Sequence, residues 1–167
     1  MLEYRGCCIE AISMKNKSTK KVFSAAKLRK IALQYLEENR LMSIAVCKGK
    51  RPWAATVFFA HDKSFNVLFF SRPDTVHARF AKENNLIAGT VNHKQGKTGS
   101  VKGIQFEGMC QLVSEKDLGK FYRIFNRRFS WAKKFENDHK LFIIRLKNLY
   151  MIDDEQFGHF YRVSIPI

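Results

Sequence analysis

The chain carries a succession of short β-type runs, and this pattern constrains its fold more than any other feature. Apolar residues alternate with polar ones or form short apolar blocks, and turn residues separate the blocks. The runs cover residues 41–47, 53–60, 65–71, 86–92, 102–113 and 139–153. The tight polar turn at 61–64 predicts an antiparallel hairpin. Because strands and helices do not alternate regularly, we do not expect a parallel doubly wound sheet.

Three segments of helical period accompany the strands, at 24–39, 75–85 and 114–129. Each begins at a Ser, Thr or Asp that can cap the first turn. One apolar face of the first helix is formed by Leu28, Ile31, Ala32, Tyr35 and Leu36. We therefore expect a mainly β protein with inserted helices (α+β), built as a small antiparallel barrel with helices over its open end.

The composition is globular but strongly basic. Hydrophobic residues make up 46% of the 167, which is enough for one sizeable core. Residues 1–22 form a basic N-terminal extension that could be mobile, and we expect 23–167 to be a single domain. The net charge of +15 includes two stretches without acids, 15–30 and 120–134. Anionic partners such as nucleic acid or a phosphorylated cofactor therefore fit the chain.

Membrane insertion and secretion are not expected. No apolar run approaches the roughly 20 residues that a membrane span needs. The first residues lack the apolar stretch of a secretory signal, and the four cysteines show no C-x-x-C pair. We expect a cytoplasmic protein whose thiols are reduced.

Familiar catalytic motifs are missing from the sequence. Gly96–Thr98 reads GKT, but Val91 stands where a P-loop needs its first glycine. The histidines are scattered, so a zinc site is not expected. No local signature marks a nucleophile, and the catalytic residues remain unknown.

The segment FFSRPDTVHARF (69–80) is the most informative one. A strand ends at Ser71 and a helix begins near Thr75, so unpaired N–H groups and hydroxyls could meet an anion there. His77 and Arg79 add two potential cations. The alternative is an ordinary capped helix with solvated charges.

A second segment mixes basic and aromatic residues. YRIFNRRFSWAKK (122–134) has the composition of a surface for single-stranded nucleic acid. The rings at 121, 125 and 129 recur at helical spacing, however, which favours a buried role for them. The basic face then becomes a solvated surface or a weak site for a polyanion.

Two stretches resemble a known family. FNVLFFSRPDTVHARFAKENNLIAGTVN and VKGIQFEGMCQLV are similar to the core of the flavin-binding split-barrel proteins, the superfamily of pyridoxamine 5'-phosphate oxidase. Within it, the chain most resembles the uncharacterised bacterial YhbP-like branch, which has similar runs to GIQFEG and NRRF. The resemblance covers about residues 25–160. It implies a split antiparallel barrel of the FMN-binding type.

The resemblance also implies a cofactor and a site. It implies a homodimer that holds FMN in a groove between the subunits and oxidises or reduces an unknown small molecule. Ser71 lies beside the FMN phosphate in this alignment. Thr75 and His77 stand where the oxidase branch grips the phosphate, and Arg79 follows one turn later.

Three further residues follow from the same resemblance. Ala55 and Thr56 fall on the strand whose backbone flanks the flavin ring, and Gln105 falls on a strand where the oxidase branch uses a glutamine. The residues that bind pyridoxamine phosphate in the oxidase have no clear match here. Two alternatives stay open: a polyanion-binding barrel without enzymatic activity, and a haem-handling split barrel with His61, His77 or His93 as axial ligand.

Overall fold

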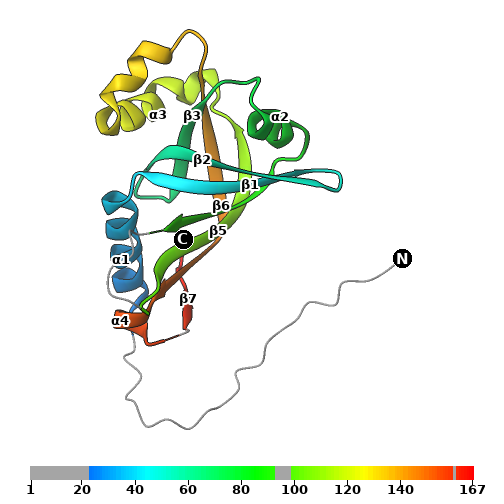
Figure 1. Ribbon diagram of the computed structural model, residues 1–167. Helices are drawn as coiled ribbons and strands as arrows, with labels where there is room; N and C mark the ends of the chain where they lie inside the picture. The colour runs from blue at the N-terminus through cyan, green and yellow to red at the C-terminus, as the bar shows by residue number, and fades with distance from the viewer. Residues whose placement is uncertain (1–22, 93–98, 160) are drawn as a thin grey trace.

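The computed structural model describes residues 23–92, 99–159 and 161–167, which form one antiparallel sheet with helices around it (Figure 1). The strands are β1 (Leu41–Lys48), β2 (Arg51–His61), β3 (Asn66–Ser71), β4 (Leu86–Asn92), β5 (Lys102–Leu112), β6 (Lys140–Asp153) and β7 (Arg162–Ser164). The helices are α1 (Ala25–Glu38), α2 (Val76–Glu83), α3 (Glu115–Arg128), the 3-10 helix η1 (Ser130–Phe135) and α4 (Asp154–Phe157). The extension at 1–22 lies outside the described residues.

The sheet closes into a six-stranded barrel. The strand order is β3-β2-β1-β4-β5-β6-β7, and β3 also pairs with β6. At this closure Phe69 pairs with Phe142, and the two rings stack with their centroids 4.9 Å apart. All the pairs are antiparallel, so the expected small antiparallel barrel and its six strands are confirmed.

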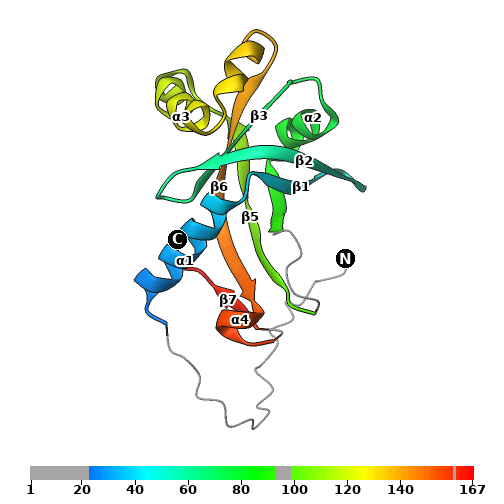
Figure 2. The same cartoon turned by 60° about the vertical axis from the view of Figure 1, so that its left-hand side comes forward.

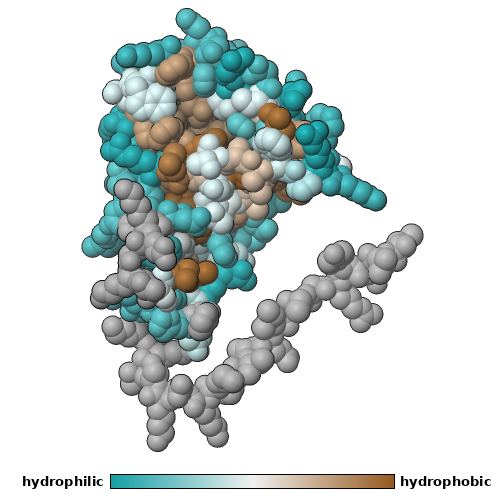
Figure 3. Space-filling model, viewed as in Figure 1, coloured by the Kyte–Doolittle hydropathy of each residue, from teal (hydrophilic) through white to brown (hydrophobic). Residues whose placement is uncertain are grey.

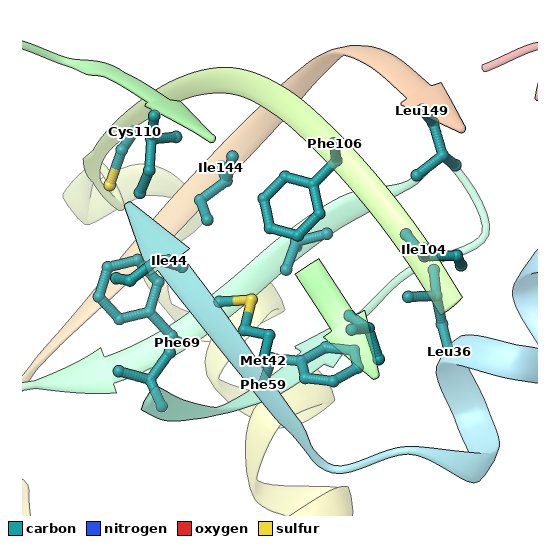
Figure 4. Packing of buried hydrophobic residues seen from close by; sticks show 14 of the residues in the cluster. Leu36, Met42, Ile44, Phe59, Phe69, Ile104, Phe106, Cys110, Ile144 and Leu149 are labelled. Atoms are coloured by element: carbon teal, nitrogen blue, oxygen red, sulfur yellow. The ribbon is translucent and has the colours of Figure 1, made fainter. Parts of the chain in front are cut away.

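Strand alternation fills the barrel with large apolar side chains. Figure 4 shows labelled side chains of β1, β2, β3, β5 and β6 meeting in the interior, among them Met42, Ile44, Phe59, Phe69, Ile104, Phe106, Cys110 and Ile144. Gly89 on β4 makes room for one of these rings. A Cβ there would lie 2.3 Å from Phe106 Cζ and 2.8 Å from the Ser43 carbonyl oxygen. The site therefore tolerates only glycine without repacking.

The helices cover two different surfaces. Buried residues of α1 and α2 join the barrel core, and Figure 2 shows α2 and α3 toward one end of the barrel with α1 and α4 toward the other. The expectation of helices over the open end is wrong for α3. Its rings pack instead on the outward side of β2, β3 and β6, in a second cluster that contains Phe121, Phe125, Phe129, Ala60, Leu68, Leu141 and Ile143.

The tail, for which the sequence made no prediction, folds onto β6. Asp153 caps α4, because its Oδ1 accepts hydrogen bonds from the backbone N–H groups of Glu155 and Gln156, at 3.2 and 3.0 Å. β7 then pairs with β6. Within the described ranges, no helix has both the length and the apolar character needed to cross a membrane.

Candidate functional site

A cluster of three polar side chains lies where β3 ends and α2 begins. Ser71 Oγ is 2.8 Å from His77 Nε2 and 3.4 Å from Thr75 Oγ1, and Thr75 Oγ1 is 3.2 Å from His77 Nε2. Ser71 is buried, whereas Thr75 and His77 are half-buried. The structure therefore brings together three residues that the sequence proposed for a phosphate site.

Local chain geometry creates this cluster. The turn is held by Thr75, whose backbone N–H and Oγ1 both donate to the Arg72 carbonyl, at 3.3 and 2.9 Å. Thr75 is also the N-cap of α2, since its Oγ1 accepts from the Ala78 N–H at 3.4 Å. Arg72 pairs with Asp74 at 2.6 Å on the exposed side of the turn. The cluster thus sits at the positive end of a helix dipole.

Burial favours the uncharged form of the His77 ring. Burial lowers its pKa from the ordinary value of 6.5. The His77 ring and the Ser71 hydroxyl share one hydrogen bond, in which the tautomer of the ring decides which group donates. The ring also lies beside Phe69, with ring centroids 6.2 Å apart. A bound phosphate would favour the charged ring and would therefore raise this pKa again.

Arg79 does not join the cluster. It lies on the exposed side of α2, and its charge helps to lower the pKa of the Asp74 carboxyl, whose larger cause is the Arg72 hydrogen bond. Any contact with a phosphate would need the Arg79 side chain to reach around the helix start.

Thr56 and Gln105 lie in one row across the outer face of the barrel. Thr56 pairs with Ser43, Ser43 with Thr90, and Thr90 with Gln105. Residues in lateral register point to the same side of a sheet, so these four polar side chains share a face. Three strand spacings separate Thr56 from Gln105, about 14 Å. Ala55 points the other way and packs against the barrel core.

A second row on the same face consists of small residues. Ala54 pairs with Ala45, and Ala45 with Ala88, and all three are exposed. Sequence reasoning missed both rows apart from Thr56 and Gln105. Their signal was the alternation within each strand, but only the pairing register shows that they are neighbours.

Large apolar side chains border these rows. They are Leu41, Phe58, Leu86 and Met109, with exposed fractions of 47, 43, 54 and 39%. Figure 3 shows brown and pale side chains gathered over β1 and β2 in the middle of the view, with hydrophilic residues around them. An exposed apolar area with a polar border is typical of a surface that binds a partner.

The two described histidines that were considered as haem ligands already contact other side chains. His61 is 8% exposed, and its Nε2 lies 3.3 Å from Glu37 Oε2. His77 belongs to the polar cluster, and His93 lies outside the described residues. The described ranges also contain no group of three or more His, Cys, Asp or Glu side chains that could hold a metal ion.

Comparison with known sequences gives bacterial relatives. No model of a protein family matches the chain. The UPF0306 protein of Cronobacter sakazakii is 28% identical over 123 residues, which cover 72% of this chain and 83% of that protein. The UPF0306 protein Cj1449c of Campylobacter jejuni is 29% identical over 115 residues, covering 68% and 81%.

Comparison with solved structures gives the fold. A candidate pyridoxamine 5'-phosphate oxidase of Listeria innocua matches with a TM-score of 0.62 and 14% identity, over 75% of this chain and 98% of that one. A FAD-binding protein of Mesorhizobium loti matches with a TM-score of 0.61 and 15% identity, over 72% and 90%. A heme binding protein of Mycobacterium smegmatis matches with a TM-score of 0.70 and 14% identity, over 86% of this chain but 58% of that one.

The protein is thus a split barrel of the pyridoxamine 5'-phosphate oxidase type, as the resemblance predicted. Within that class it is similar to the UPF0306 proteins of bacteria, which are the YhbP-like relatives expected from the sequence. The solved neighbours include a FAD-binding protein and a heme binding protein, so the fold alone does not choose the cofactor.

Proposed function

We propose that the protein binds FMN in a groove between two subunits and serves as a flavin-dependent oxidoreductase for a small molecule. The observation that carries the proposal is the convergence of Ser71, Thr75 and His77 at the start of α2. Two hydroxyls, one imidazole and the first N–H groups of a helix match the donors that a phosphate monoester needs.

The cluster would hold the phosphate end of the cofactor. The three side chains now satisfy one another, and a phosphate would replace those mutual contacts with stronger, charge-assisted ones. Binding would raise the pKa of His77, so one proton would be taken up at its ring near and below neutral pH. Arg79 would add long-range attraction.

The outer face of the barrel would receive the ring. Ala54, Ala45 and Ala88 leave the backbone accessible to a flat aromatic system, and Thr56 and Gln105 border the rows with hydrogen-bonding groups. The exposed apolar border of this face would be covered by a second copy of the chain. When bound, FMN supplies hydride or electron transfer, and the protein supplies position and exclusion of water.

Haem is the second candidate, because one solved neighbour is a heme binding protein. An axial histidine would have to leave its present contact, either Glu37 for His61 or Ser71 for His77. Haem is the weaker candidate, because it would use one histidine alone, whereas a phosphate would use all three side chains of the cluster.

The test is a comparison of two flavins with the purified, cofactor-stripped protein. Calorimetry should give binding of FMN at least tenfold tighter than binding of riboflavin, because only FMN carries the phosphate. Equal affinities for FMN and riboflavin would mean that the phosphate makes no contact with the protein. No binding of either flavin, together with a Soret band on haem titration that is lost in a histidine variant, would replace FMN with haem.

A further inference from the structure

A basic stripe runs along the solvent side of α3. Lys116, Lys120, Arg123 and Arg127 follow one another at intervals of four, three and four residues. This spacing places all four on one face of the helix, over about 16 Å of its length. Phe121 and Phe125 occupy the opposite, buried face. The stripe is therefore held rigidly by a helix that is packed against the barrel.

The surface is hollowed beside this stripe. One hollow of about 440 Å³ is lined by Lys120, Arg123, Ile124 and Arg127. A second hollow of about 180 Å³ shares Ile124 and Arg127 and adds Arg40 from the end of α1. The two hollows are neighbours, because they share Ile124 and Arg127, and together they are called the basic groove below.

Four cations of the groove have no carboxylate partner among the residues that the structure describes. In the described part of the chain, Lys120, Arg123, Arg127 and Arg40 form no ion pair, whereas Arg128 pairs with Glu37 at 3.1 Å. Glu37, the acid that lines the groove, is already engaged by Arg128 and His61. Unpaired like charges held in one groove repel one another, and an anionic occupant would remove that repulsion.

Two exposed aromatic rings follow the stripe. Trp131 and Phe135 on η1 are 40 and 44% exposed. Trp131 rests edge-on against Phe58, with ring centroids 5.2 Å apart, so its position is fixed although it faces solvent. Cations on a helix that is followed directly by exposed rings are a combination that suits single-stranded nucleic acid.

We propose that single-stranded nucleic acid binds along α3, with its phosphates in the basic groove and its bases against Trp131 and Phe135. Consecutive cations of the stripe are separated by about 4.5–6 Å along the helix, so an extended strand can contact several of them. A duplex would keep its bases stacked away from the two rings. The proposal does not depend on FMN binding, although Trp131 contacts Phe58 at the border of the face proposed for the flavin.

The test is fluorescence anisotropy with the full chain and a 5'-labelled 12-nucleotide oligo(dT). The variant Arg123→Gln with Arg127→Gln should bind at least tenfold more weakly at 50 mM salt. Its slope of log K against log salt should be smaller by about 1.4, since two phosphate contacts are lost. The matched control is Lys50→Gln with Lys82→Gln, which removes the same charge from the β1–β2 turn and α2.

A separate variant tests the role of the exposed rings. Trp131→Ala should weaken binding about fivefold or more and leave the salt slope unchanged, because a stacked base is lost without any phosphate contact. Thermal unfolding of each variant shows whether it is folded. The proposal is overturned by equal losses in the two double variants, by the absence of binding to oligo(dT) at 50 mM salt, or by tighter binding to the matching duplex.

Discussion

At the scale of single residues, the polar cluster depends on spacing within a short segment. Ser71, Thr75 and His77 lie within seven residues of one another and are joined by one turn. The end of a strand, a capping threonine and the first helical turn were all readable from the sequence, so this part of the candidate site was predicted. Thr56 and Gln105 were named too, but their shared row required the strand register.

Removing two members of the cluster should weaken FMN binding. We expect Thr75→Ala combined with His77→Ala to reduce the FMN affinity by about 1–3 kcal/mol, the range for hydrogen bonds to a charged group. Calorimetry at pH 7 measures the change.

Riboflavin is the internal control for this variant. Its affinity should stay the same, because it lacks the phosphate that the cluster would hold. An unchanged FMN affinity would mean that the phosphate binds elsewhere on the protein.

Two partly buried histidines should make the fold sensitive to acid. Burial lowers the pKa of both His61 and His77 from the ordinary 6.5. As the pH falls below about 6.5, the unfolded chain takes up these protons first, so the free energy of unfolding should fall until the lower, folded pKa values are passed. Urea unfolding of the FMN-free protein between pH 7.5 and 5 measures this loss.

Substituting these two histidines should flatten that pH profile. His61→Gln combined with His77→Gln should reduce the decline below pH 6.5. A profile unaffected by the double substitution would assign the acid sensitivity to other groups.

At the scale of elements, Arg128 joins α3 to the end of α1. Its Nη2 donates to the carbonyls of Leu36 and Glu37, at 2.9 and 2.8 Å, and also to that of Asn39. Its Nη1 pairs with the Glu37 carboxylate at 3.1 Å. The sequence grouped this arginine with a solvated basic face, and that interpretation was wrong for it. It satisfies carbonyls that a helix end leaves unpaired.

Loss of this contact should destabilise the fold. Arg128→Ala leaves several half-buried carbonyls without a donor, and we expect the free energy of unfolding to fall by about 2–3 kcal/mol. Chemical denaturation measures the change. Arg128→Lys keeps the charge but not the fork of donors, so it should recover less than half of the loss. Full recovery by lysine would show that charge alone matters.

The position of a residue along β5 decides whether an apolar side chain on its inner face is buried. The alternation of residues along β5 puts Leu112 on the same face of the strand as Ile104, Phe106 and Cys110. Leu112 is 52% exposed, while the other three are buried. The pattern gives the side of the strand correctly, but it does not say where along the strand the core ends.

At the scale of the whole molecule, the groove proposed for FMN requires two copies of the chain. Ala45 lies in the middle of the exposed alanine row on the outer face of the barrel. We expect the natural chain to sediment as a dimer and Ala45→Arg to shift it to a monomer, because a long charged side chain would enter the closest contact.

The matched control is Ala26→Arg at the start of α1, which adds the same charge away from that face. The control should remain dimeric and should bind FMN as the natural chain does. A natural chain that sediments as a monomer at micromolar concentration would contradict the shared groove.

The sequence by itself determined the elements and the local cluster. Alternation and helical period are local properties, and so are the capping residues of α1 and α2, which is why β1 to β6, the helices α1 to α3 and the Ser71–His77 segment were predicted, but η1, α4 and β7 were not. Only the tertiary structure decided the β3–β6 closure, the row from Thr56 to Gln105, the outer position of α3 and the groove beside it. These features join residues far apart in the chain, and their pairing depends on the packing of the complete barrel.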